Sequence, residues 1–385
     1  MKQITVLLIS LFISFFAYGQ NKAALSLQKT VDKVQSLKTL SYSYHLTQKN
    51  PLSEGDTNYI NMRCLLKFNA HGLTKQKRDK TISGKGQPQF EVVLRNDTLY
   101  QLDLDDSTYS FHTKPEADQV NLGMMSVIEQ IQYALEKNRP NIFQRKDTVI
   151  NGLSCSYFFI KSFDEMVNGR HDFTYDYVAI NKATLLPVFF KEIGAGITEK
   201  GGQTIGRLTF FEEAHFTNIK INQAIPANAL NFDLASFSLQ NKQLLTEGSM
   251  APALKLKNLQ NKDVPLTDFN NKILLIAFDA TNCAANALAN PVLNRISKKY
   301  ASSNFSIVSI FTSEAADKVS KYKEANHLEF PVYLGVLQTK KAFKTVGTPN
   351  FYLVDKDGRI VKSVDGYNDD MEKELVAKID EELKK

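Results

Sequence analysis

The chain has 385 residues, of which 43% are hydrophobic and 23% are charged, a composition typical of globular proteins. A chain of this length exceeds one ordinary hydrophobic core and indicates two domains. The formal net charge of +6 is dispersed, and the densest basic run, Lys-Gln-Lys-Arg at residues 75–78, has no interleaved aromatic residues. We therefore expect that run to form a solvated face, and nucleic-acid binding is not supported.

The first 19 residues have the pattern of a secretory signal peptide. Lys2 is followed by an uncharged, mostly apolar segment at residues 4–16, and small residues then precede Gln20. The apolar segment is too short to cross a bilayer, and no later segment has the roughly 20 apolar residues that a membrane span needs. No cysteine stands at the expected cleavage site, so a lipid anchor is not expected. We predict a signal peptide at residues 1–19 and a periplasmic protein that is not an integral membrane protein.

Residues 20–233 begin with a helical pattern and continue mostly as strands. Leu27, Val31 and Val34 form an apolar helical stripe, and a second amphipathic helix is predicted at residues 124–135. Alternation of apolar and polar residues predicts strands at residues 40–46, 60–68, 90–94, 98–104, 109–112, 153–159, 173–179, 186–192 and 206–219. This order predicts an α+β domain with a curved sheet, one face of which is covered by the helices.

Two of the three cysteines lie in these predicted strands. Cys64 and Cys155 both fall on the apolar side of their strands, which predicts burial. If the strands pair in sequential order, many strands separate the two cysteines, whereas a disulfide needs Cα atoms within about 7 Å. We therefore predict that both are buried, free thiols.

Two short motifs in this region support a family resemblance. Residues 181–188 read Asn-Lys-Ala-Thr-Leu-Leu-Pro-Val, with Leu185 where a glycine is usual, and the region ends with the strand at 216–222 followed by Ile225-Pro226. Together with the element order, these residues resemble the LolA-like lipoprotein-carrier superfamily. The resemblance implies a curved antiparallel open β-barrel with helices on its concave side, and a concave side that holds an apolar or lipid ligand. The alternative is that the same apolar face is simply a filled core.

The composition changes near residue 240, where a second domain is expected. Residues 234–247 form a polar stretch that we interpret as a linker, and residues 248–385 form the second domain. Apolar runs and amphipathic patterns predict strands at 273–278, 305–312, 330–334, 351–354 and 359–364, and helices at 284–300, 314–326, 338–346 and 371–384. This order predicts an α/β domain.

Cys283 directly follows the predicted strand at 273–278 and opens a helix that contains Pro291. A Val-Gly-Thr-Pro run at residues 346–349 comes about sixty residues later. This arrangement resembles the thioredoxin-like family, in its TlpA-type and AhpC/TSA-like branch. The resemblance implies that the Thr348–Pro349 bond is cis and lies against the Cys283 sulfur, where it shapes a substrate groove. The helix start favours the thiolate form of such a cysteine.

Four positions depart from the pattern of redox-active relatives. Asn286 replaces the second cysteine of the family's Cys-x-x-Cys motif, and an amide cannot attack a mixed disulfide. Asn282 stands where the family has tryptophan, and Asp279 stands where an aromatic residue is common. The Asp279 carboxylate disfavours a nearby thiolate. Ala277 occupies a position where relatives often carry a buried Asp or Asn.

Two functions from different classes follow from these residues. In the first, the protein is a thiol-disulfide oxidoreductase that forms mixed disulfides with exported protein thiols through Cys283 alone. In the second, it is a redox-inactive binding or scaffold protein for an envelope partner, and its first domain holds an apolar ligand. Peroxidase chemistry is not favoured. Peroxiredoxins need a Pro-x-x-x-Thr-x-x-Cys motif, and this chain has Ile276 in place of the proline and Ala280 in place of the threonine. We expect no cofactor, and the six histidines show no metal-ligand spacing.

Overall fold

The computed structural model describes residues 22–52, 57–82, 89–200, 203–240, 243–265, 269, 271–312, 314–345 and 347–385. The predicted signal peptide, residues 1–19, lies outside the described residues. The described chain divides into two compact units. The first comprises residues 57–196, 209–239 and the described residues up to Lys49, and the second comprises residues 240–385 with two short segments at 50–56 and 197–208.

The first unit contains a large sheet, 13-stranded in the described residues. Its strands are β1 (Thr39–Lys49), β2 (Thr57–Phe68), β3 (Thr74–Thr81), β4 (Phe90–Arg95), β5 (Thr98–Asp103), β6 (Thr108–Thr113), β7 (Ile142–Gln144), β8 (Thr148–Ile150), β9 (Leu153–Val167), β10 (Arg170–Asn181), β11 (Pro187–Lys200), β12 (Gln203–Ile221) and β13 (Ser238–Leu239). The path is open and runs β13-β6-β5-β4-β3-β2-β1-β12-β11-β10-β9-β7, with β8 paired to β9. The strand pairs described within residues 20–233 are antiparallel, whereas β13, which lies in the predicted linker, pairs with β6 in parallel.

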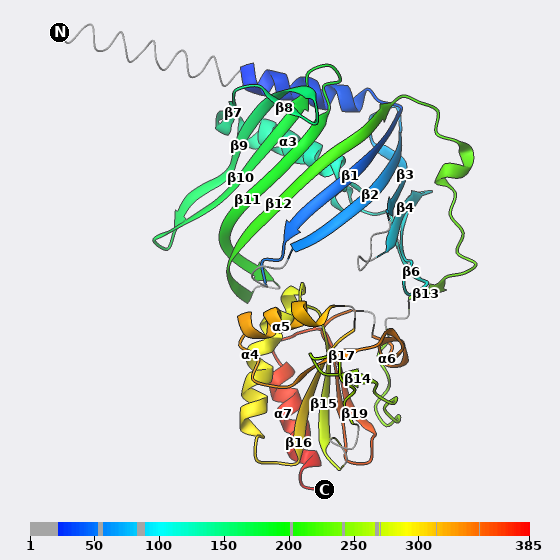
Figure 1. Ribbon diagram of the computed structural model, residues 1–385, viewed down its shortest axis with the longest axis vertical. Coiled ribbons are helices and arrows are strands. Elements are labelled where there is room, and N and C mark those ends of the chain that lie inside the picture. The colour runs from blue at the N-terminus through cyan, green and yellow to red at the C-terminus, as the bar shows by residue number, and fades with distance from the viewer. Residues whose placement is uncertain are drawn as a thin grey trace, which may run out of the picture. The chain divides into compact units, whose positions relative to one another are not determined.

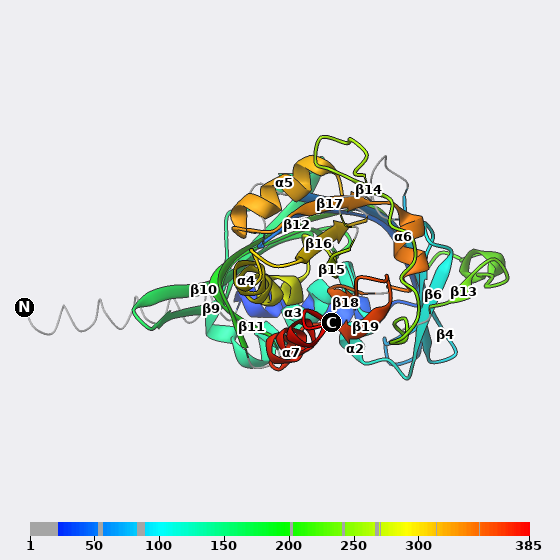
Figure 2. The same ribbon diagram turned by 90° about the horizontal axis from the view of Figure 1, so that it is seen from below.

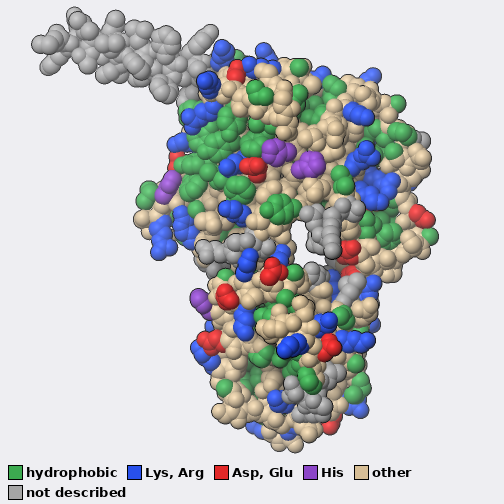
Figure 3. Space-filling model, viewed as in Figure 1, with side chains coloured by type: hydrophobic (Ala, Val, Ile, Leu, Met, Phe, Trp, Pro, Cys, Tyr) green, Lys and Arg blue, Asp and Glu red, His purple; other side chains and the backbone are tan. Residues whose placement is uncertain are grey.

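Helices cover the concave face of this sheet. A helix over residues 22–35 and α3 (Met124–Lys137) pack on it, and shorter turns form at α2 (Ala117–Val120), η1 (Arg139–Asn141) and η2 (Ala227–Leu230). Figure 2 shows the strands curving around α3. The predicted helical stripe of Leu27, Val31 and Val34 is buried in one core with α3 and the inner strand residues. On the opposite face of the sheet, His45 of β1 pairs with His215 of β12, and Figure 3 shows two histidine side chains side by side.

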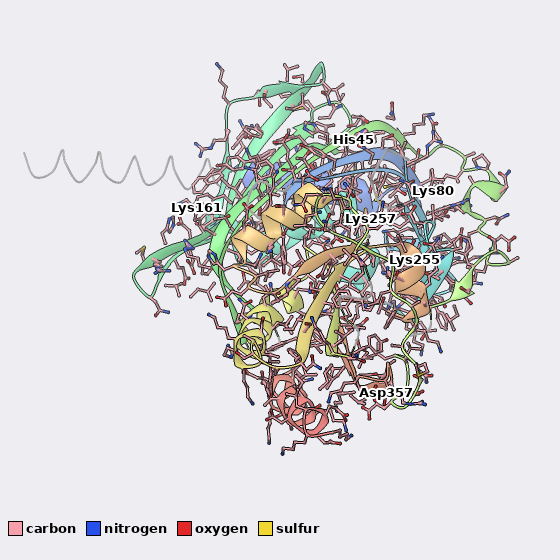
Figure 4. The ribbon with its side chains drawn as sticks, turned by 60° about the horizontal axis from the view of Figure 1, so that its bottom comes forward. His45, Lys80, Lys161, Lys255, Lys257 and Asp357 are labelled. Atoms are coloured by element: carbon pink, nitrogen blue, oxygen red, sulfur yellow. The ribbon has the colours of Figure 1, made fainter. Side chains whose placement is uncertain are left out.

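The basic run at residues 75–78 is not the solvated face that its composition predicts. It lies in β3, and the Lys77 side chain is only 1% exposed, with its Nζ 2.7 Å from Asp79 Oδ2. Arg78 pairs with Glu91 of β4. Lys80, labelled in Figure 4, is half-exposed on the same strand. Charged residues of opposite sign neutralise one another inside the sheet. A segment as highly charged as β3 therefore cannot be recognised as a strand from its composition alone.

The turn between β10 and β11 bears on the first motif at residues 181–188. Leu185 has a φ of +60°, the left-handed conformation that favours glycine. The turn is closed by hydrogen bonds from Leu185 N to Asn181 O (2.8 Å) and from Asn181 N to Leu186 O (3.0 Å). The backbone therefore has the shape that a glycine would adopt more easily, although the chain carries a leucine there.

The second unit is built on a six-stranded sheet in the described residues, in the order β14-β17-β16-β15-β18-β19. The strands are β14 (Leu256–Lys257), β15 (Ile273–Asp279), β16 (Phe305–Phe311), β17 (Val332–Gly335), β18 (Asn350–Val354) and β19 (Ile360–Asp365). The helices are α4 (Ala284–Lys299), α5 (Ala316–Ala325), α6 (Leu337–Ala342) and α7 (Met371–Glu382). Each of the nine strands and helices predicted from residue 273 onwards is present, with ends shifted by a few residues at most.

Alternate residues of the central strand β15 enter two different cores. Leu275 and Ala277 face a core with α4, α5 and α7, whereas Ile276 and Phe278 face a second core beside α6. Figure 1 shows α4 and α7 on one side of the sheet. Burial on both faces explains why β15 is a continuous apolar run. The α4 helix contains Pro291, as predicted. Among the described residues, no helix has both the length and the hydropathy needed to cross a bilayer.

Candidate functional site

Cys283 occupies the N-cap of α4, directly beyond the C-terminal end of β15. Its backbone is extended, with φ of −98° and ψ of 116°, and its amide donates to Ala280 O at 3.3 Å. The side chain is partly exposed, and the thiol donates a hydrogen bond to Thr348 O at 3.1 Å. This hydrogen bond uses the thiol proton, so it is available only to the protonated sulfur. The residue is therefore neither fully buried nor fully exposed in the second unit.

The Thr348–Pro349 peptide bond is cis, as predicted. Thr348 is partly exposed and Pro349 is buried, and the Pro349 carbonyl accepts a hydrogen bond from Gly366 N at 2.9 Å. The cis Thr348–Pro349 peptide bond therefore lies next to the Cys283 sulfur, because the Thr348 carbonyl accepts the hydrogen bond from the thiol. The structure brings Cys283, Thr348 and Pro349 together from segments about sixty-five residues apart.

Asn286 lies one helical turn after Cys283, and its side chain is fully buried. Its backbone amide donates to Cys283 O at 3.1 Å, and its side-chain amide donates to Asp279. The Asn286 Oδ1 atom has no hydrogen-bond partner among the described residues. The place of a second cysteine is therefore taken by an amide that is bonded away from the sulfur and into the interior.

Asp279 is the buried carboxyl of this site. The side chain is 5% exposed, and its Oδ2 accepts a hydrogen bond from Ser309 of β16 at 2.5 Å. The pKa of Asp279 is raised to about 7, chiefly by burial and also by Glu314, whereas the donors from Ser309 and Asn286 lower it. Such a carboxyl changes charge near neutral pH, within a few residues of the thiol.

The remaining two departures, Ala277 and Asn282, take different places. Asn282 is exposed beside Cys283, whereas Ala277 is fully buried in β15. Because side chains alternate along a strand, Asp279 points to the same side of the sheet as Ala277, the side covered by α4. The sequence predicts Asp279 only as a charge near the sulfur, and its contact with Asn286 is not predicted. The alternation of side chains along β15 was the sequence signal that could have placed Asp279 on the side of the sheet covered by α4. Nothing in the sequence indicated Ser309.

The other two cysteines are free and buried, as predicted. Cys64 lies on β2 between Tyr42 of β1 and Asp79 of β3, which are its cross-strand neighbours. Burial raises the pKa of the Cys64 thiol well above its ordinary value, and Asp79 raises it further. In the described part of the chain, no three His, Cys, Asp or Glu side chains gather into a group that could hold a metal ion.

Comparison with known proteins assigns the second unit. Residues 248–363 match the AhpC/TSA family. The C-terminal region is a thioredoxin-like domain. The thiol-disulfide oxidoreductase ResA of Bacillus cereus is 25% identical over 143 residues, which cover 37% of this chain and 83% of that protein. ResA of Bacillus subtilis is 26% identical over 139 residues, which cover 36% of this chain and 78% of that protein.

Solved structures of similar proteins match the same part of the chain. The thioredoxin domain of a thiol-disulfide oxidoreductase from Bacteroides vulgatus is 24% identical, with a TM-score of 0.33, and the match covers 35% of this chain and 99% of that domain. A thiol:disulfide interchange protein from Bacteroides sp. is 25% identical, with a TM-score of 0.33, and the match covers 35% of this chain and 91% of that protein.

Proposed function

We propose that this protein is an exported thiol-disulfide oxidoreductase that forms mixed disulfides with protein thiols through Cys283 and does not resolve them itself. The observation that carries the proposal is the placement of one partly exposed cysteine at the start of α4, with its sulfur against the carbonyl that precedes Pro349. Similarity of the C-terminal region to thiol-disulfide oxidoreductases supports the same class of chemistry. Export through residues 1–19, cleavage before Gln20 and a periplasmic location are part of this proposal.

The reaction is one step of thiol–disulfide exchange. The Cys283 thiolate attacks one sulfur of a partner's disulfide, a Cys283–partner S–S bond forms, and the partner's S–S bond breaks. The second partner sulfur leaves as a thiolate and takes up a proton. A second thiol, supplied by another protein or a small molecule, must then attack the mixed disulfide and release Cys283.

Asn286 explains why the first step does not continue within the chain. A resolving residue must supply a nucleophilic sulfur, and the Asn286 amide has none and is bonded to Asp279. Pro349 and Thr348 form the surface against which the partner chain is placed. The protein would therefore hold a partner covalently until an external thiol arrives.

This proposal is tested by incubating the reduced protein with glutathione disulfide and measuring intact masses without reductant. We expect one glutathione adduct per chain, mapped to Cys283, and its loss in Cys283→Ser. The matched control is Cys155→Ser, which should leave the adduct unchanged because Cys155 is buried in the first unit. Adduct formation that persists in Cys283→Ser, or that is absent from the wild type, contradicts the proposal.

A second candidate function is a binding role for the first unit, residues 20–233, joined by a linker at 234–247 to the thioredoxin-like domain. A cavity of about 300 Å³ lies under α3 and favours this candidate. An open sheet with helices on its concave face is the arrangement that a LolA-like domain would have, and we propose that this cavity holds an apolar or lipid ligand. In that case the protein serves as a carrier or scaffold for an envelope partner, with or without chemistry at Cys283.

A further inference from the structure

The cavity lies between α3 and the inner face of the sheet. Strands β1 and β12 supply Tyr44 and Phe216, whose rings stack with their centroids 5.5 Å apart, and β2 supplies Met62. Its volume of about 300 Å³ is at the lower end of the range for small-molecule sites, which is on the order of 300–1,000 Å³. Walls of this kind bury an alkyl chain and offer it few polar partners.

Polar groups enter the cavity from two opposite sides. Glu212 projects from β12, and Gln130 projects from α3. The Oε1 atom of Gln130 is buried and has no hydrogen-bond partner among the described residues, and Glu212 receives a long hydrogen bond of 3.4 Å from Gln48. A buried acceptor without a donor is destabilising, so a ligand that supplies a donor is stabilised there.

Further carboxyls extend this acceptor surface along the sheet. Glu192 of β11 lies directly opposite Asp176 of β10 and raises the pKa of Glu212, to which burial is the larger contribution. Burial raises the pKa of Asp176 to about 7, and its Oδ1 atom has no hydrogen-bond partner in the described residues. A cation placed beside these three neighbouring carboxyls favours their ionised form, so the cluster stabilises an ammonium or another N–H donor more than an anion.

We propose that the cavity under α3 binds a single-chain amphiphile whose head group is an ammonium or another N–H donor, with Glu212 as the acceptor for that head group. The inference rests on the proposed binding role of the first unit, and adds to it the chemistry of the head group. It sets this site apart from one for free fatty acids, because a carboxylate head would face Glu212.

The test uses the full two-unit chain and three ten-carbon probes that differ only in the head group: decylamine, decanol and decanoate. Each is titrated at pH 7 against the bound fluorescent probe N-phenyl-1-naphthylamine. We expect decylamine to displace the probe at a concentration at least about tenfold lower than decanoate, with decanol between them. In the isosteric variant Glu212→Gln, the decylamine and decanoate values should come within about threefold of each other.

The failure of this inference and the failure of the binding role give different results. If decanoate displaces the probe as well as decylamine does, the inference is overturned while the apolar site stands. Ser126→Phe, which fills the cavity from α3, should abolish binding of the probe. If the probe does not bind the wild type, or binds Ser126→Phe equally well, both the binding role and the inference are overturned.

Discussion

Cys283 and Cys64 each lie near a buried aspartate, but their surroundings are opposite in character. Cys64 is 2% exposed and has Tyr42 and Asp79 as cross-strand neighbours, so burial and the carboxyl both oppose its ionisation. Cys283 is partly exposed, and the nearby carboxyl of Asp279 is engaged by Asn286 and Ser309. The two sites therefore differ in what the aspartate contacts and in how far the cysteine is exposed, although each cysteine has a buried carboxyl nearby.

Among changes around Cys64, removing the Lys77 ammonium beside Asp79 should cause the largest loss in the free energy of unfolding. Lys77 Nζ lies 2.7 Å from Asp79 and 2.5 Å from Val120 O, so Lys77→Met leaves a buried carboxyl without its cation. We expect a loss of about 3–5 kcal/mol in the free energy of unfolding, measured by urea titration. The exposed Lys80→Met change on the same strand should alter it by less than about 0.5 kcal/mol. Equal effects of the two changes would contradict a structural role for the buried pair.

On the Cys283 side, Asp279 should make stability depend on pH. The folded state holds its proton up to about pH 7, whereas the unfolded state releases it near 4, so the folded state binds more protons between these values. The free energy of unfolding therefore falls as pH rises from 4 to 7, by up to about 4 kcal/mol from this group. Asp279→Asn should lack this part of the slope. Parallel pH profiles for wild type and variant would show that the pKa of Asp279 is the same in the folded and unfolded states.

Removing the hydroxyl of Tyr42, the β1 neighbour of Cys64, should reduce the free energy of unfolding by less than removing the cation beside Asp79, the β3 neighbour. Tyr42 OH accepts a hydrogen bond from Met124 N at 3.2 Å, at the start of α3. Tyr42→Phe removes this acceptor and keeps the ring, so we expect a loss of about 1 kcal/mol in the free energy of unfolding. Thermal unfolding of the variant measures it. A loss as large as that of Lys77→Met would mean that the hydroxyl, and not the ion pair, organises this cluster.

The sequence predicted the second unit more fully than the first, for physical reasons. Strands buried on both faces, such as β15, are continuous apolar runs, and short turns link them to helices with clear periodicity. In the first unit, β3 was missed because Lys77 and Asp79 neutralise each other inside the sheet, which composition cannot reveal. The contact of Asn286 with Asp279 also required the structure, because it depends on how α4 is set against the end of β15.

We propose that Asn286 stops the exchange reaction at the mixed disulfide, because its side chain has no nucleophilic sulfur. The direct measurement is a time course of the glutathione adduct on Cys283 in the wild type and in Asn286→Cys, after excess glutathione disulfide has been removed. We expect the wild-type adduct to persist until a thiol is added, whereas the variant should release glutathione and form an internal disulfide between Cys283 and the introduced cysteine. If the wild-type adduct decays without added thiol as fast as that of Asn286→Cys, Asn286 does not block the second step.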